Sequence, residues 1–419
     1  MKKRNPLWAV PGKLFFLAGL FFFTGCFEPP SAARSAARPA PALKPDSSGS
    51  PRNREQESSL TIIAAGDNLI HDIIYNSARI DGGFNFDPSY EHIKSIIESA
   101  DIAFVNQETV LGGEQFGHSG YPVFNTPQDV GLGLINAGFD VVNHASNHTM
   151  DKGEKAVYGA MDFWDAHPEI LYLGIFRTEE QRKTEKRIIE KNGITTGFLS
   201  YTYGLNGFVL PPDKPWLVGM IDRDVMAREI DELRPLCDLL VVSMHWGDEF
   251  QHKVSETQRE LARFMAERQV DLIIGHHPHV TQGVEIIPRP GGGFLSCYYS
   301  LGDLLSHTQS AWTPDTVTGA LAYIRIKKTW TAGTSGAAGT SGAAGASGAA
   351  TITVDRAQVI PTVCHYGRER GSPFIVYPLW DYTDELAALH YKKNLTVEYF
   401  YRLAWDTFGL RVLEKTTPR

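Results

Sequence analysis

Three histidines stand within four residues, at positions 276, 277 and 279, directly after the strand-like run 271–275. They come from only 14 histidines in a chain of 419 residues, and neutral imidazole is the commonest protein ligand for transition metals. In extended backbone, side chains two positions apart face the same side, and Pro278 fixes φ between His277 and His279. We therefore expect these two histidines to bind two neighbouring metal ions or the same ion.

Two carboxylates also follow apolar runs that resemble strands. Asp67 comes after Gly66 and the run 60–65, and Glu108 ends the run 102–108. A carboxylate at a strand end is well placed to bind a cation, and the two oxygens of Glu108 could bridge two ions. Glu108 could instead cap the following turn. His71, four residues after Asp67, could reach the same ion or simply begin a helix.

The segment 143–153 holds two Asn-His pairs and an aspartate that precedes an expected helix. The carboxamide oxygen of Asn147 is a workable metal ligand that adds no charge to an anionic site. His148 is offset by one residue, so it points elsewhere and can act as a general acid or polarise a substrate oxygen. We take His148 and Asp151 as the candidate catalytic residues.

A further histidine follows the near-continuous apolar run 239–244, which is typical of a central buried strand. His245 emerges at its end, where an unpaired imidazole would be costly to bury. Glu249 could support that histidine or contact substrate. Together, the candidate metal ligands are Asp67, Glu108, Asn147, His245, His277 and His279.

Short apolar runs alternate with amphipathic stretches from position 60 onward, which is the pattern of an α/β fold. The candidate residues follow expected strands, and ligands collect at the carboxyl edge of open α/β sheets. The expected strands are 60–65, 102–105, 140–142, 171–175, 196–201, 239–244, 271–274, 294–299, 321–326 and 351–359. The expected helices are 90–99, 128–136, 153–166, 224–233 and 256–268.

Residues 1–26 are typical of a bacterial export signal. Four basic residues precede the apolar run 14–23, which is too short to span a bilayer, and small residues lead to Cys26. The pattern resembles the lipobox of bacterial lipoproteins, which implies that Cys26 is acylated. The protein would then be exported and anchored by lipid to a membrane, at the cell surface or in the periplasm. A cleaved signal peptide with an unmodified Cys26 is the alternative.

Residues 27–59 are rich in Ala, Pro, Ser and Arg without apolar periodicity, so we expect a disordered tether. Residues 1–59 carry nine basic and four acidic side chains, so the net charge of −8 leaves −13 for the rest. This acidic domain argues against nucleic-acid binding, because Lys and Arg surfaces hold phosphate backbones. Without Cys26, three cysteines remain, and either one disulfide or buried free thiols are open: Cys237, Cys297 and Cys364.

The second half of the chain contains a low-complexity segment. Residues 331–350 hold three hexads of Gly, Ala, Ser and Thr that cannot build a core, so we expect a loop between two antiparallel strands. Residues 60–330 would form the main domain, and 351–419 would add a final strand and C-terminal helices. Apolar residues at helical spacing, among them Leu389, Leu395 and Trp405, predict a helical pair that packs on the domain edge.

The chain resembles the CapA family of bacterial poly-γ-glutamate capsule synthesis proteins, which are related to calcineurin-like metallophosphoesterases. The resemblance spans about 60–305 with its spacing in register. It rests on Gly-Asp at 66–67, Asn-Gln-Glu at 106–108, Asn-His-Thr-Met-Asp-Lys-Gly at 147–153, His-Trp-Gly-Asp-Glu at 245–249, Gly-His-His-Pro-His-Val at 275–280 and Tyr-Ser-Leu-Gly-Asp at 299–303.

This resemblance implies a four-layer αββα sandwich with mixed sheets and a site for two divalent ions, of Mn, Fe or Zn. By position, one ion would be held by Asp67 and His279, the other by Asn147, His245 and His277, with Glu108 as the bridge. His148 would face the leaving group. The carboxylate that usually follows this histidine is Thr149 here, with Asp151 two residues further on.

These features favour a surface-anchored, metal-dependent hydrolase or transferase that acts on an anionic capsule polymer such as poly-γ-glutamate during synthesis, export or processing. The family implies a membrane synthase complex as a partner. One alternative is a metallophosphoesterase for another extracellular phosphorylated substrate. The other is a non-catalytic polymer-binding or assembly protein with a degenerate metal site, which bound metal would distinguish from the two enzymes.

Overall fold

Residues 55–307, 314–331, 350–413 and 415 are described by the computed structural model. The expected export signal with Cys26, positions 27–54 of the expected tether and positions 332–349 of the repeat segment lie outside the described residues. Strand β1 (Glu55–Asn68) includes the last five residues of the expected tether, so that boundary at 59 is wrong. These first residues form a strand although they lack apolar periodicity, because backbone pairing with β14 holds them in the sheet, as in the pair Ser58 and Lys328.

The first of two large sheets is built around β1. Its strand order is β16-β15-β14-β1-β4-β5-β6, and β13 also pairs with β1. β1 runs parallel to β4 and β13 and antiparallel to β14, so the sheet is mixed. Besides β1, its strands are β4 (Ile102–Gln107), β5 (Val141–Asn143), β6 (Leu171–Leu173), β13 (Asp303–Leu305), β14 (Thr318–Thr331), β15 (Thr351–His365) and β16 (Ile375–Pro378).

The second sheet has the order β11-β12-β10-β9-β8-β7. Its four central strands are parallel and its two edge strands are antiparallel to their neighbours, so this sheet is mixed as well. The strands are β7 (Ile188–Lys191), β8 (Ile194–Thr202), β9 (Leu239–His245), β10 (Leu272–His276), β11 (Thr281–Pro288) and β12 (Phe294–Leu301). A small hairpin pairs β2 (Arg79–Ile80) with β3 (Gly83–Phe84).

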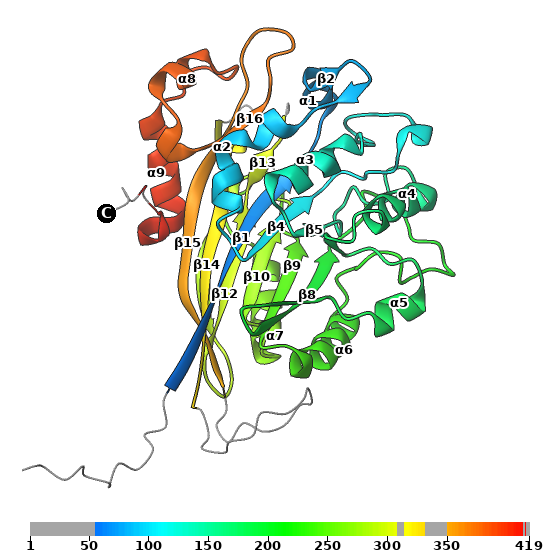
Figure 1. Ribbon diagram of the computed structural model, residues 1–419, viewed down its shortest axis with the longest axis vertical. Coiled ribbons are helices and arrows are strands. Elements are labelled where there is room, and N and C mark those ends of the chain that lie inside the picture. The colour runs from blue at the N-terminus through cyan, green and yellow to red at the C-terminus, as the bar shows by residue number, and fades with distance from the viewer. Residues whose placement is uncertain (1–54, 308–313, 332–349, 414, 416–419) are drawn as a thin grey trace, which may run out of the picture. The chain divides into compact units, whose positions relative to one another are not determined.

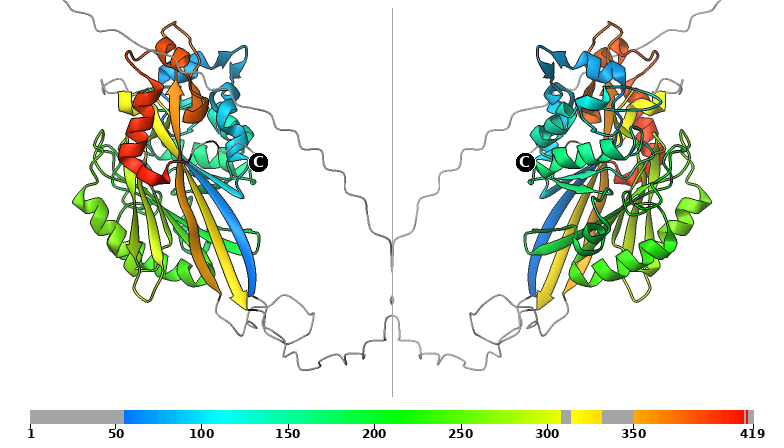
Figure 2. Two further views of the ribbon diagram at one scale, coloured as in Figure 1. Left: turned by 90° about the vertical axis from the view of Figure 1, so that its left-hand side faces the viewer. Right: turned by 90° about the vertical axis from the view of Figure 1, so that its right-hand side faces the viewer.

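Helices cover the outer faces of both sheets, as Figures 1 and 2 show. The α-helices are α1 (Asp72–Ser77), α2 (Asp87–Ile97), α3 (Asp129–Ala137), α4 (Glu154–Asp165), α5 (Glu179–Thr184), α6 (Arg223–Leu233), α7 (Glu256–Glu267), α8 (Asp384–Leu389) and α9 (Val397–Phe408). Short 3₁₀ turns are η1 (Glu114–Phe116), η2 (Arg234–Leu236), η3 (Pro314–Val317), η4 (Leu379–Asp381) and η5 (Gly409–Arg411).

Alternating side chains of β1 divide the core into layers, because successive residues of a strand point to opposite faces. Ile62 and Ala64 pack between the sheets with Val241 of β9 and Ile274 of β10. Ile63 lies on the other face of β1, in the cluster that includes residues of α2, α3 and α4. A third cluster joins the outer face of the second sheet to α6 and α7. The expected four-layer αββα sandwich with mixed sheets is therefore confirmed.

The C-terminal helices pack on the domain edge, where the expected residue Leu395 is buried, but other residues of the expected apolar set face outward. Phe400 and Ala404 of α9 are buried, whereas Leu389 and Trp405 are 65% and 40% exposed. The spacing of apolar residues alone does not distinguish which of two candidate stripes contacts the domain. Cys237, Cys297 and Cys364 are free thiols. Within the described ranges, the helices are all too short or too polar to cross a membrane.

Candidate metal centre

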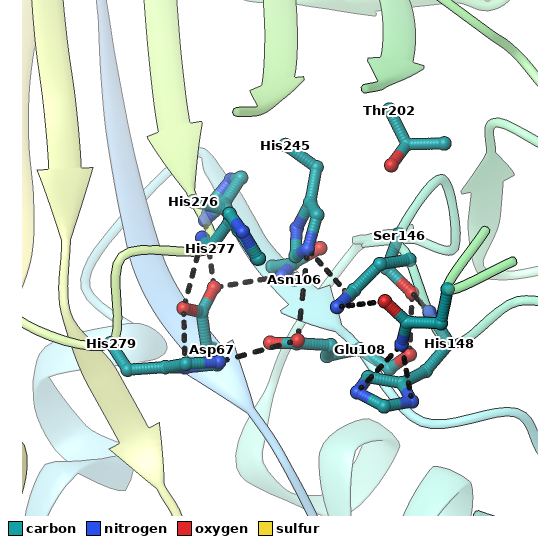
Figure 3. A network of polar contacts seen from close by, with 12 residues as sticks. Asp67, Asn106, Glu108, Ser146, His148, Thr202, His245, His276, His277 and His279 are labelled. Atoms are coloured by element: carbon teal, nitrogen blue, oxygen red, sulfur yellow. Dashed lines mark hydrogen bonds and ion pairs between the residues drawn. The ribbon is translucent and has the colours of Figure 1, made fainter. Parts of the chain in front are cut away.

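The carboxyl ends of parallel strands from both sheets bring the candidate residues together (Figure 3). Asp67 is the penultimate residue of β1, and Glu108 directly follows β4. His245 is the final residue of β9, and His277 directly follows β10. All four residues are buried, so the sheet–sheet interface, rather than an external loop, positions this centre.

Ligand-type atoms of this centre form three overlapping groups, and within each group the atoms lie within 4.8 Å of one another. Two of the groups are fully buried and the third includes the exposed Glu249. The groups are Glu108, His245 and His277; Asp67, His279 and Asp303; and Glu249, His277 and His279. The first two correspond to the two separate ion sites that the family pattern implies, with Asp303 as an additional member.

Glu108 lies between the two buried groups. Its Oε1 is 3.6 Å from Nε2 of His245 and 3.6 Å from Nε2 of His279. Neither carboxylate oxygen has a hydrogen-bond partner, and Nδ1 of His277 is also buried without one. Buried polar atoms are normally paired, because an unpaired one loses its hydration. These oxygen and nitrogen atoms have lone pairs and no hydrogen-bond partner, so they are suitable ligands for divalent transition metals.

Three asparagines lie at or beside the ligand atoms. Oδ1 of Asn147 is 2.9 Å from Nε2 of His245, so both atoms can face a shared point. Asn106 donates from Nδ2 to Oδ1 of Asp67 at 2.8 Å, and Asn143 donates to Oδ1 of Asn106 at 2.7 Å. This buried carboxamide chain fixes the orientation of the Asp67 carboxylate.

The expected extended backbone between His277 and His279 is wrong. Both residues have positive φ, of 96° and 56°, which is rare outside glycine. The chain reverses here between β10 and β11, and the left-handed residues make that turn. The backbone N–H of His277 donates to Oδ2 of Asp67 at 3.1 Å, and Nδ1 of His279 is 2.9 Å from Oδ1 of Asp303. These contacts hold both residues in conformations that strain the backbone.

His148 pairs with Asp151 at the side of the centre. Nδ1 of His148 is 2.8 Å from Oδ2 of Asp151, which also accepts from the backbone N–H of Phe124 at 2.7 Å. The ring of Phe124 contacts the imidazole edge to face at 4.7 Å. Asp151 thus supplies the carboxylate that Thr149 does not, because the turn after β5 brings the third residue onward back to His148.

His71 and Glu249 have different surroundings. His71 is buried against Phe124 and His307, and its Nδ1 accepts from the backbone N–H of His307 at 3.3 Å. Burial, followed by the charge of His307, lowers the pKa of His71 to about 3. His71 is in none of the three ligand groups, whereas Glu249 can join His277 and His279 from the exposed side.

The buried carboxylates respond differently to this environment. Desolvation by itself would raise the pKa of Asp67, but the neighbouring imidazoles of His276 and His279 hold that pKa well below its usual value. Desolvation raises the pKa of Glu108 well above its usual value. Asp67 therefore carries the negative charge more readily than Glu108 does.

The histidines also differ from one another in the direction of their pKa shifts. Burial lowers the pKa of His245 well below its usual value and that of His277 to about 3, and neighbouring histidines add to both effects. Desolvation also acts against the charged form of His279, but Glu108 and Asp303 raise its pKa well above the usual value. Neutral imidazoles present a lone pair for coordination, and a metal ion would displace the proton of His279.

Three residues at or beside the candidate metal centre had no role assigned from the sequence. Asp303 follows β12 in a Gly302-Asp303 pair that repeats the Gly66-Asp67 pattern, and this repeat was a usable signal. Asn106 could be recognised only from its register opposite Asp67. Tyr203, whose ring centroid lies 4.5 Å from that of His277, follows β8 without any distinctive motif.

A family model described as "Bacterial capsule synthesis protein PGA_cap" matches residues 61–308, which is more than half of the chain. The chain belongs to this bacterial capsule synthesis protein family. The matched segment begins in β1 and extends beyond β13, so it includes all of the candidate ligands and the pair His148 and Asp151. β14, β15 and the C-terminal helices lie outside it.

Two curated relatives carry capsule-related names. The PGA biosynthesis protein CapA of Bacillus subtilis (strain 168) is 30% identical over 200 residues, which cover 47% of this chain and 50% of the relative. The capsule biosynthesis protein CapA of Bacillus anthracis is 33% identical over 186 residues, which cover 42% of each chain. The chain thus spans about half the length of the curated relatives that it matches.

Solved structures give weaker matches. The NAD nucleotidase NadN of Haemophilus influenzae is 11% identical, with 84% of this chain and 64% of that chain covered and a TM-score of 0.43. A putative 5′-nucleotidase from Staphylococcus aureus is 13% identical, with coverage of 64% and 51% and a TM-score of 0.39. Similarity of this extent carries no inference about activity.

Proposed function

We propose that this chain holds two divalent metal ions. It would use them to hydrolyse a bond in a capsule polymer of the poly-γ-glutamate type, or to transfer part of that polymer, during its synthesis, export or processing. The observation that carries the proposal is the pair of partner-free oxygens of Glu108, buried between two ligand groups. The capsule-related names of the two relatives support the substrate class.

The residues present would divide between two ions. One would be held by Asp67, His279 and Asp303, the other by Asn147, His245 and His277, with Glu108 shared between them. Such ions, when bound, polarise a carbonyl or phosphoryl oxygen and make a bound water acidic. Mn, Fe and Zn all fit this mixture of imidazole and carboxylate donors.

His148 would supply a proton to the leaving group. Its hydrogen bond to Asp151 fixes the ring orientation with Nδ1 facing Asp151, so the proton to be transferred would be the one on Nε2. For a γ-glutamyl amide the acceptor of that proton would be the departing amine nitrogen. Positioned general acids typically contribute about 10²–10⁴-fold to rate.

The test is the shortening of purified poly-γ-glutamate by the metal-loaded chain, followed by gel electrophoresis and by the appearance of new amines. Wild type should shorten the polymer, and His148→Gln should do so about 10²–10⁴-fold more slowly while it keeps its metal. His92→Gln, at an exposed histidine, is the matched control and should behave as wild type.

A metal-loaded wild type that leaves the polymer intact would rule out hydrolysis of this substrate. If the same protein cleaved a model phosphodiester, the metallophosphoesterase alternative would replace the proposal.

We also propose that Cys26 is acylated and anchors the chain to a membrane at the cell surface or in the periplasm, beside a membrane synthase complex. The support is the Thr-Gly-Cys sequence at 24–26 after an apolar run. Cys26→Ser should move the protein from the membrane fraction to the soluble fraction. A variant that remains in the membrane fraction would contradict lipid anchoring through this cysteine.

A further inference from the structure

A cavity of about 200 Å³ is lined by residues of β8, α5 and α6, three elements that lie near one another in Figure 1. Much of its apolar lining comes from Leu173 at the end of β6, Phe176 three residues further on, Phe198 of β8 and Leu233 of α6. Of the residues that line it, none is a candidate metal ligand. The cavity therefore needs an explanation of its own.

Arg187 lines this cavity and is only 7% exposed. Its guanidinium lies 5.1 Å from the ring centroid of Tyr172 and 5.8 Å from that of Phe176, which holds the group in place. Nη1 donates to Glu185, but Nε and Nη2 are buried and have no hydrogen-bond partner. The Nε–Nη2 edge is a planar fork of parallel donors, the geometry that binds a carboxylate with two hydrogen bonds.

Trp216 adds a second orphaned donor. Its Nε1 is buried without a partner, and the residue lines the same cavity. Arg187 also borders a neighbouring, more open cavity beside Tyr172, but Trp216 does not. The first cavity is thus the one that both residues line. Leaving such buried groups unpaired is unfavourable.

All of the partner-free buried side-chain atoms among the described lining residues are donors. The nearby Arg182 is already used, because Nε donates to Oε1 of Glu229 at 2.7 Å and Nη1 reaches the carbonyl of Trp216 at 3.3 Å. A ligand that satisfies this cavity must therefore accept hydrogen bonds rather than donate them.

The charge and size of the cavity further limit the class of ligand that it can bind. Five cationic and four anionic side chains line the cavity, which leaves one positive charge to balance. A dianionic phosphate would exceed that balance. The volume of about 200 Å³ suits a small molecule rather than a polymer segment. The apolar walls suit a short hydrocarbon body.

We propose that this cavity binds a small monocarboxylate with an apolar body, whose carboxylate sits on the Nε–Nη2 edge of Arg187 and accepts from Nε1 of Trp216. None of the candidate metal ligands lines this site, so it stands whether or not the chain cleaves a capsule polymer.

Isothermal titration of the purified chain with butyrate tests this site. Wild type should bind one butyrate per chain, and neither the neutral isostere butyramide nor inorganic phosphate should bind comparably. Arg187→Lys keeps the charge but removes the fork, and it should weaken binding at least tenfold. Trp216→Phe removes a single N–H and should weaken binding about fivefold, as the loss of one hydrogen bond of about 1 kcal/mol does.

Arg263→Lys is the matched control, because Arg263 is exposed and distant in the sequence from the cavity lining, and it should bind as wild type does. If Arg187→Lys does not fold, as judged by circular dichroism, Trp216→Phe decides the question. Absence of butyrate binding at tens of millimolar, unchanged binding in the folded variants, or equal binding of phosphate would each overturn the proposal.

Discussion

At the scale of single residues, Glu108 is the group whose environment most needs a metal ion. A carboxylate enclosed in protein normally accepts several hydrogen bonds, yet both of its oxygens lack a partner. Desolvation accordingly raises the pKa of Glu108 well above its usual value. The nitrogens of His245 and His279, each 3.6 Å from Oε1, cannot relieve this at hydrogen-bond distance. A cation on either side would satisfy both oxygens.

Asn106 provides a residue-scale prediction about this centre. Because its Nδ2 orients the carboxylate of Asp67, Asn106→Ala should weaken metal binding about 10–100-fold, the usual effect of losing a group that positions a ligand. Competition with a fluorescent chelator measures the affinity. Asn136→Ala, at an exposed asparagine of α3, is the control and should leave the affinity unchanged.

Equal affinity in Asn106→Ala and wild type would mean that Asp67 is not a ligand or needs no orientation. Circular dichroism of both variants separates a local effect from loss of the fold.

At the scale of elements, the turn between β10 and β11 concentrates strain at the centre. His277 and His279 both occupy the left-handed region, which costs about 1–3 kcal/mol per residue. The contacts to Asp67 and Asp303 come from β1 and β13 of the other sheet. The centre therefore depends on the two sheets being packed together, rather than on the turn alone.

A second contact between elements predicts a pH dependence of stability. His252 lies between the carbonyl of Thr281 and Oδ2 of Asp315, each at 2.9 Å, and Asp315 also accepts from Tyr399 of α9. The hydrogen bond with Asp315 raises the pKa of His252, and the hydrogen bond with His252 lowers the pKa of Asp315. The contribution of His252 is therefore complete below its ordinary pKa of 6.5 and is lost as pH rises through the raised value.

The free energy of unfolding in urea should thus differ more between wild type and His252→Gln at pH 6 than at pH 8.5. The side chain of His252 is 37% exposed, so solvent screening limits the effect to about 0.2–1 kcal/mol. The contribution of Asp315 to the free energy of unfolding is lost only in acid, as pH falls below its ordinary pKa of 3.8. His167→Gln, at a histidine paired with Glu169, is the control. An equal difference at both pH values would contradict the coupling.

At the scale of the whole molecule, the layers and the approximate position of the centre could be predicted from the sequence. Buried strands such as β9 are continuous apolar runs, and the candidate residues His245 and Glu108 follow such runs directly. The short strand β13 has no such signal, because its three residues are held by pairing with β1.

The remaining features depend on contacts between distant segments. Asn106 gains its role only from lying opposite Asp67 in the register of β1 and β4. The left-handed backbone of His277 is fixed by a hydrogen bond over 210 positions of sequence. Arg187 and Trp216 meet at one cavity although no motif joins them. Local patterns cannot encode such juxtapositions.

The metal content of the folded chain tests the central proposal most directly. Wild type, His277→Ala, His279→Ala and the exposed control His92→Ala would be supplied with Mn, Fe or Zn, freed of excess metal and analysed by elemental mass spectrometry. We predict close to two ions per chain in wild type and His92→Ala, and a clear loss in both His277→Ala and His279→Ala. A folded wild type that retains no metal, or retention unchanged in both centre variants, would contradict the two-metal site.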